Sequence, residues 1–125
     1  MMIKNILLVG LGGFLGSIVR YLTAIAFTRV GEPFPSGTFT INIIGCLAIG
    51  VIYGLAERNA LLSTEWRLFL ATGFCGGFTT FSTFAYENIA LLEIREYLTA
   101  LLYTGGSIVI GFAAAAIGII ITKQF

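Results

Sequence analysis

Residues 97–122 read YLTALLYTGGSIVIGFAAAAIGIIIT, a stretch that contains no charged side chain. An α-helix rises about 1.5 Å per residue, so a helix over this stretch is long enough to cross a hydrocarbon core roughly 30 Å thick. The stretch therefore predicts a membrane-spanning helix from about Tyr97 to Thr122.

Three more apolar runs of similar length precede it. They cover about Asn5 to Thr28, interrupted by Arg20, about Thr38 to Ala56, and the residues between Arg67 and Glu87. Hydrophobic residues make up 58% of the chain and charged residues 10%, a balance far from that of water-soluble domains. We expect an all-α membrane protein with a single domain of four transmembrane helices over residues 1–125.

The links between the runs are short and rich in turn-forming or charged residues. One lies between Arg29 and Gly37 and holds both prolines, a polar one runs from Glu57 to Glu65, and the last is Glu93-Ile94-Arg95-Glu96. Links of this length make consecutive helices antiparallel. The N-terminal side of the membrane then carries the basic residues Lys4, Arg58, Arg67 and Lys123, and the other side carries Arg29 and Arg95, with Arg20 nearer to it.

This division of basic residues gives only a weak orientation preference by the positive-inside rule. A chain that inserts in both orientations can pair with an inverted copy of itself. Four helices are also too few to enclose a transport path. We therefore expect an antiparallel dual-topology homodimer, although four basic residues against two or three could still select one orientation.

Several classes of function lack their characteristic residues. The chain has no histidine, no Cys-x-x-Cys, no Gly-x-Ser-x-Gly and no pair of buried carboxylates, so an enzyme is not expected. A net charge of +1 gives no reason to expect a nucleic-acid partner. The glycines between Gly10 and Gly16 superficially resemble a dinucleotide-binding loop, but the alternating strands and helices of that fold are missing.

Small residues recur at the spacing of close helix packing. Gly12 with Gly16, Gly50 with Gly54, and Gly73 with Gly77 form three small-xxx-small pairs, for which helix packing is the default interpretation. Cys46 and Cys75 fall inside the second and third runs, where we expect them to pack as small apolar residues.

Polar residues at membrane depth are the candidates for function, because burying them costs free energy unless they are paired or hydrated. They are Arg20, Asn42 and the cluster from Thr79 to Thr83. Asn42 either makes an interhelical hydrogen bond or faces water. The stretch from Gly73 to Phe84 combines poor helix formers with β-branched residues, which predicts a break in the third helix.

Such a break frees carbonyl groups that favour a cation, and amides and hydroxyls that favour an anion. The alternative is a continuous helix whose hydroxyls bond back to carbonyls one turn earlier. Phe81 and Phe84 share a helix face with Glu87. Their rings either pack against neighbouring helices or turn a positive edge toward a small anion.

Three motifs in this order resemble the signature of the Fluc/CrcB fluoride channels over the whole chain. They are Gly12-Gly13-x-x-Gly16-x-x-x-Arg20-Tyr21, Gly37-Thr38-x-x-x-Asn42-x-x-Gly45 and Gly73-x-x-Gly76-Gly77-x-Thr79-Thr80-Phe81-Ser82-Thr83-Phe84. The resemblance implies a fluoride-selective channel that exports cytoplasmic fluoride passively and confers fluoride resistance. It also implies a multi-pass protein of the cell inner (plasma) membrane, an antiparallel homodimer with two pores, and a structural sodium ion at the dimer axis.

The same resemblance implies roles for individual residues. Phe81, Phe84 and Asn42 match pore-lining positions, with Ser82 and Thr83 as a hydroxyl track beside them and Tyr103 and Ser107 on the fourth helix. Arg20 and Glu87 match vestibule positions, and the carbonyls of Gly76 and Thr79 match the sodium ligands. One departure is the fourth helix, where some relatives place a further hydroxyl and this chain has Gly111 and Ala115.

Two other classes compete with this expectation. Small multidrug-resistance exporters are also four-helix dual-topology dimers, but they need a buried carboxylate in the first helix, where this chain has Arg20. A membrane scaffold that transports nothing would use every glycine and hydroxyl for packing.

Overall fold

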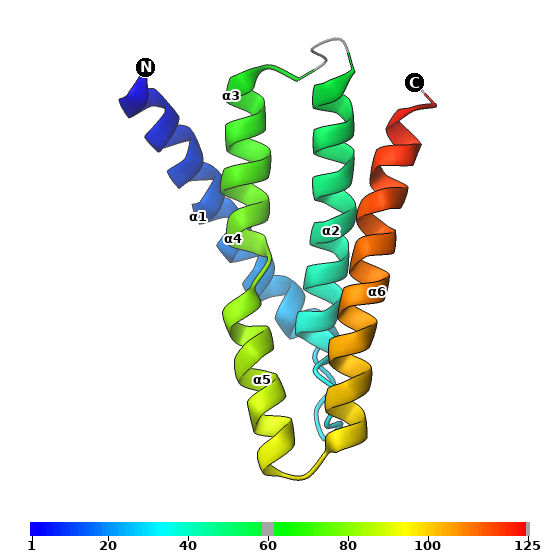
Figure 1. Ribbon diagram of the computed structural model, residues 1–125. Coiled ribbons are helices and arrows are strands. Elements are labelled where there is room, and N and C mark those ends of the chain that lie inside the picture. The colour runs from blue at the N-terminus through cyan, green and yellow to red at the C-terminus, as the bar shows by residue number, and fades with distance from the viewer. Residues whose placement is uncertain (59–61, 125) are drawn as a thin grey trace.

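The computed structural model describes residues 1–58 and 62–124, and every element in this part of the chain is a helix. Four membrane-length segments follow one another, as Figure 1 shows. The elements are α1 (Met2–Phe27), α2 (Ser36–Glu57), α3 (Thr64–Arg67), η1 (Leu68–Cys75), α4 (Gly76–Phe78), α5 (Phe81–Glu93) and α6 (Tyr97–Thr122). Elements α3, η1, α4 and α5 together form the third segment, Thr64–Glu93.

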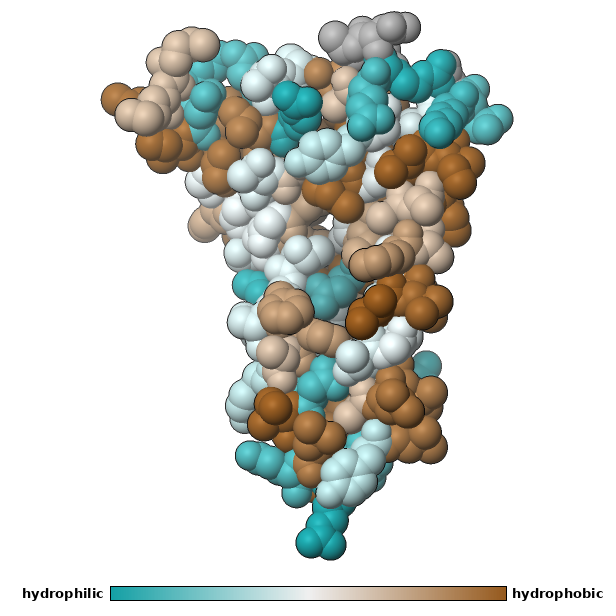
Figure 2. Space-filling model, viewed as in Figure 1, coloured by the Kyte–Doolittle hydropathy of each residue, from teal (hydrophilic) through white to brown (hydrophobic). Residues whose placement is uncertain are grey.

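The four segments run antiparallel in sequence order, and both chain termini lie at the same end of the molecule (Figure 1). Figure 2 shows hydrophilic residues at both ends and a mostly hydrophobic body between them, with a smaller hydrophilic patch part-way along. The prediction of four helices long and apolar enough to cross a membrane is confirmed. Residues 59–61 of the predicted polar link lie outside the described part.

The third segment extends past Glu87, where its charge-free run ends, to Glu93, where the predicted turn begins. A carboxylate is a poor residue for the hydrocarbon core, so the sequence suggested a membrane boundary there. The Tyr103 hydroxyl donates a hydrogen bond of 3.1 Å to Glu87 Oε1, and this contact compensates part of the cost of burying the charge. The helix therefore does not need to end.

Glycines bring α1 against the third segment. A Cβ atom on Gly12 would overlap the carbonyl oxygen of Phe69, and one on Gly16 would overlap that of Phe74. These overlaps involve backbone atoms, which cannot rotate away. Where α1 approaches, η1 is a π-helix, a wider turn that sequence periodicity did not predict.

The second close pair is α2 with α6. A Cβ atom on Gly50 would overlap the Ala115 carbonyl oxygen, and Gly118 lies against the backbone of Leu47 and Val51. At the ends of the two helices, Arg58 Nη1 donates to the Thr122 carbonyl oxygen at 2.5 Å. The packing interpretation of the small-xxx-small pairs is confirmed.

Two separate apolar clusters fill the molecule. One is centred on Ile52, Ala71 and Cys75, and so lies toward the end that holds the chain termini. The other is centred on Leu91, Ala100 and Tyr103, toward the opposite end. Because the clusters pack on different halves of the third segment, the region between them coincides with the interruption at Thr79 and Thr80.

Candidate functional site

The third helix is interrupted at two residues. Thr79 has φ −82° and ψ 159°, and Thr80 has φ −149° and ψ 117°, so both are extended. The helix ends at Phe78 and resumes at Phe81. The predicted break is confirmed, but it is narrower than the stretch from Gly73 to Phe84 that suggested it, because the glycines there remain helical. Of these, Gly73 and Gly77 pack against α1.

Asn42 of α2 holds the interruption in place. The Thr80 backbone N–H donates to Asn42 Oδ1 at 3.0 Å, and Asn42 Nδ2 donates to the Thr80 carbonyl oxygen at 3.2 Å. Of the two interpretations of Asn42, the interhelical hydrogen bond is the one that the structure contains. The amide group retains a second N–H and a further lone pair, so it can still contact another group.

These contacts remove two hydrogen bonds that a continuous helix would contain. The Thr80 N–H points to Asn42 instead of the Gly76 carbonyl, and the Thr83 N–H donates to Thr80 Oγ1 at 3.2 Å instead of to the Thr79 carbonyl. The carbonyls of Gly76 and Thr79 thus lose their usual helical donors. Carbonyl oxygens are suitable ligands for a hard cation such as sodium, so the residues present fit the predicted ion.

The other side of the interruption has the opposite electrostatic character. Helix α5 begins at Phe81, and its first backbone N–H groups and helix dipole favour a negative charge. Thr80 caps this end through the bond from Thr83. One short break therefore presents acceptors at the end of α4 and donors at the start of α5.

A cavity of about 450 Å³ lies beside the interruption, between α2, the third segment and α6. Among the predicted site residues, the cavity is lined by Asn42, Gly76, Thr79, Phe81, Phe84 and Ser107. Ser107 Oγ is buried and has no hydrogen-bond partner among the described residues. Ser107 thus contributes to the cavity wall a hydroxyl that makes no hydrogen bond to the described residues. Gly111 also lines the wall, so the fourth-helix position without a hydroxyl faces this space.

The two predicted pore phenylalanines differ in their surroundings. Their ring centroids are 5.8 Å apart. Phe84 meets Tyr103 in an edge-on arrangement at 5.0 Å, whereas the side chain of Phe81 is 80% exposed. Phe84 belongs partly to an apolar cluster, and Phe81 is the ring that remains unpacked within the chain.

The remaining predicted residues lie outside the lining of this cavity, as the described residues define it. Ser82 and Thr83 are exposed on α5, with Ser82 Oγ 3.5 Å from Thr80 Oγ1. Tyr103 is fully buried against Glu87. Arg20 is half-buried on α1. The structure therefore joins Glu87 to Tyr103 and leaves Arg20 apart from both.

Sequence reasoning missed two features. Thr80 was named only as a member of the polar cluster from Thr79 to Thr83, and its links to Asn42 and to the start of α5 were not predicted. The pair of Thr104 Oγ1 donating to Asn88 Oδ1 at 2.8 Å was also missed, next to Tyr103 and Glu87. In an antiparallel helical hairpin, residues at similar distances from the turn lie at a similar level. The turn at residues 94–96 could therefore have indicated that Glu87 and Asn88 lie near Tyr103 and Thr104.

Comparison with known proteins agrees with this geometry. The family model described as "CrcB-like protein, Camphor Resistance (CrcB)" matches residues 7–119. The chain belongs to this family. A protein of Chlorobaculum tepidum named "Fluoride-specific ion channel FluC" is 50% identical over 123 residues, which are 98% of each chain.

Other members of the family have similar identity to this chain and cover a similar share of it. Proteins with the same name from Chlorobium chlorochromatii and Flavobacterium psychrophilum are 51% and 45% identical, over 93% and 97% of this chain and 90% and 98% of their own lengths. The resemblance drawn from the three sequence motifs is confirmed. The CrcB family is one of ion channels rather than enzymes, as the missing catalytic residues led us to expect.

Proposed function

We propose that this protein is a fluoride-selective ion channel that exports cytoplasmic fluoride by passive electrodiffusion. The observation that carries the proposal is the broken third helix, whose freed polar groups border a cavity at membrane depth. Relatives about half identical to it over nearly their whole length are named for this ion. Export of fluoride that enters as hydrogen fluoride and dissociates inside would give the cell fluoride resistance.

The chemistry of the cavity suits a small anion. Fluoride holds its water tightly, so a dry path must replace that water with donors already in position. Asn42 and Ser107 supply neutral donors at the cavity, and Ser82 and Thr83 supply hydroxyls on the adjoining α5. The positive edges of Phe81 and Phe84 add weak attraction. Neutral groups allow the ion to leave again, whereas a fixed cation deep in the path would trap it.

Arg20 and Glu87 would act at the vestibule rather than in the path. Arg20 on α1 would raise the local anion concentration at the mouth. Tyr103 would hold Glu87 in a fixed position, because its hydroxyl already donates to this carboxylate.

The functional unit would be an antiparallel dual-topology homodimer with two pores in the cell inner membrane. A single chain leaves Phe81 exposed at the edge of the cavity, and a second copy packed there would cover this ring and close the path. Labelling a cysteine at Gln124→Cys in membranes tests this arrangement. Half of the labels should be accessible from each side, and labelling from one side alone would contradict it.

A structural sodium ion would be held at the dimer axis by the carbonyls of Gly76 and Thr79 from both copies. When bound, the ion would supply a fixed positive charge between the two chains. The carbonyls themselves need no side chain, so the ligands arise from the interruption held by Asn42. Replacing sodium by a large organic cation throughout purification and assay should lower flux, and unchanged flux would assign both carbonyls to packing.

The decisive experiment is efflux from liposomes that contain the pure protein, followed with a fluoride electrode. Fluoride should leave without a proton gradient, and chloride should be retained. A flux that needs a proton gradient would favour an exporter, and the absence of flux would favour a scaffold.

A further inference from the structure

A second groove lies between the N-terminal half of α1 and the start of the third segment. The two segments touch at Gly12 and diverge toward the end that holds the N-terminus (Figure 1). Their divergence leaves a cavity of about 370 Å³. Its apolar wall consists of Leu8 and Leu11 on α1 and Phe69 on η1.

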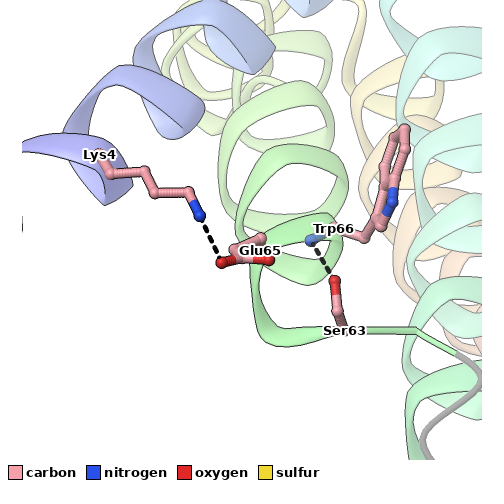
Figure 3. A network of polar contacts seen from close by, with 4 residues as sticks. All are labelled: Lys4, Ser63, Glu65 and Trp66. Atoms are coloured by element: carbon pink, nitrogen blue, oxygen red, sulfur yellow. Dashed lines mark hydrogen bonds and ion pairs between the residues drawn. The ribbon is translucent and has the colours of Figure 1, made fainter. Parts of the chain in front are cut away.

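The open end of this groove is polar and carries its two charged side chains, Lys4 and Glu65. Lys4 Nζ donates to Glu65 Oε1 at 2.6 Å, across the groove (Figure 3). Ser63 Oγ accepts from the Trp66 backbone N–H at 3.2 Å and thereby caps α3. The Trp66 ring meets Phe69 edge-on at 5.9 Å and is 57% exposed. All four of these mouth residues lie at the ends of membrane-spanning segments.

This order of groups indicates the depth of the groove in the bilayer. Trp66 is of the residue type that collects at the membrane interface, and Lys4 and Glu65 begin their segments at the level of the lipid headgroups. The Leu8, Leu11 and Phe69 wall extends from there into the hydrocarbon. An occupant must therefore be apolar below and polar above, which is the chemistry of a phospholipid.

The charges at the mouth select among phospholipids. Lys4 Nζ keeps two further hydrogens for a phosphate, and Glu65 keeps its second oxygen as an acceptor for an ammonium group. An anionic headgroup would meet the Glu65 carboxylate without compensation. A quaternary ammonium has no N–H to donate. A zwitterionic headgroup with a primary ammonium matches both charges and their hydrogen bonds.

We propose that the groove between α1 and α3 binds a zwitterionic phospholipid with a primary ammonium headgroup. Its phosphate accepts from Lys4, its ammonium donates to Glu65, and one acyl chain lies against Leu8, Leu11 and Phe69. The groove and the cavity beside Asn42 share no lining residue in the described part of the chain, and they lie on different faces of the third segment. The site is thus independent of the ion that the channel carries.

The chain offers a direct probe, because Trp66 is its only tryptophan. The protein is reconstituted in phosphatidylcholine bilayers, and a fraction of the lipid is replaced by phospholipid with brominated chains, which quenches nearby tryptophan. Quenching by brominated phosphatidylethanolamine, phosphatidylcholine and phosphatidylglycerol gives their relative affinities at Trp66. We expect the ethanolamine lipid to be favoured by about two- to fivefold over the other two, the range of one exposed charge-assisted contact.

Protein variants and modified lipid headgroups then distinguish a specific lipid-binding site from non-specific contact with the bilayer. The double variant Lys4→Gln with Glu65→Gln should lose the preference, while Arg67→Gln, a charge on the same short helix outside the groove, should keep it. With the unaltered protein, adding one, two and three methyl groups to the ethanolamine nitrogen should lower the affinity stepwise.

Three patterns of relative quenching would overturn the proposal. They are equal quenching by all headgroups, a preference for the anionic lipid, and a preference that survives in the double variant. Weak quenching by every lipid would also overturn it, because a protein surface would then cover the groove. Fluoride efflux from the same vesicles is measured in parallel, so that failure of the lipid site and failure of the channel remain distinguishable.

Discussion

The Asn42 side chain and the Thr80 backbone exchange two hydrogen bonds across the interruption of the third segment. The same amide therefore satisfies both backbone groups of an extended residue at membrane depth, where water cannot. Because Asn42 also lines the cavity, the same side chain stabilises the interruption and belongs to the proposed fluoride path.

Replacing Asn42 by alanine should destabilise the protein by about 1–3 kcal/mol, because a buried N–H and a buried carbonyl lose their partners. Fluoride efflux should fall as well, since the interruption loses its anchor. Thermal unfolding of the detergent-purified protein measures the first effect. Asn5→Ala, on the outer end of α1, is the control and should behave like the parent protein. Equal stability of the two variants would show that Asn42 does not hold the break.

Thr80 should matter through its hydroxyl oxygen. Thr80→Val keeps the shape of the side chain but removes the acceptor for the Thr83 N–H, which should lower stability by about 1 kcal/mol. Thr80→Ser keeps this oxygen and should stay close to the parent in the same unfolding experiment. If valine and serine give the same stability, the cap does not stabilise α5.

Gly12 and Gly10 form a matched pair on α1. Gly12→Ala places a methyl group against the Phe69 carbonyl oxygen and should cost about 1–3 kcal/mol. Gly10 has nothing within 4 Å of such a methyl group, so Gly10→Ala should leave stability unchanged or slightly raised. Both are compared by thermal unfolding in detergent. A cost for Gly10→Ala as large as that for Gly12→Ala would contradict the assigned packing.

Hydropathy was sufficient for the four segments, because a chain in lipid must satisfy its backbone internally and a helix does so within each run. The glycine pairs were likewise predictable, since close approach needs the same spacing wherever it occurs. The break at Thr79 and Thr80 followed from composition only in outline. Its narrow extent depends on Asn42, which lies 38 residues away in sequence.

The site was less predictable than the fold, because it also depends on contacts between residues that are far apart in sequence. Motif resemblance named Phe81 and Phe84 as a pair, but the packing of Phe84 on Tyr103 depends on how α5 meets α6. Composition also gave no reason to expect the π-helix at Leu68–Cys75, because wide turns arise from packing rather than from local preference. Tertiary contacts thus determine which of the predicted residues reach the cavity.

The difference between the two phenylalanines makes one of them the better test of selectivity. Phe84→Ile removes a ring that packs on Tyr103, so it should lower stability as well as flux. Phe81 is 80% exposed within the chain, so Phe81→Ile changes little besides the aromatic edge. We expect Phe81→Ile to reduce fluoride efflux by tenfold or more, which corresponds to about 1.4 kcal/mol in the barrier to permeation, while the dimer still assembles.

Two controls define what this result means. Phe14→Ile, an exposed ring on α1, should conduct like the parent, which separates the pore position from a general loss of aromatic residues. Arg20→Lys keeps the vestibule charge and should reduce efflux far less than Phe81→Ile. Efflux is followed with a fluoride electrode on liposomes of equal protein content. Parent-like rates in both Phe81→Ile and Phe84→Ile would mean that neutral donors alone form the path, and that the phenylalanine edges contribute only packing.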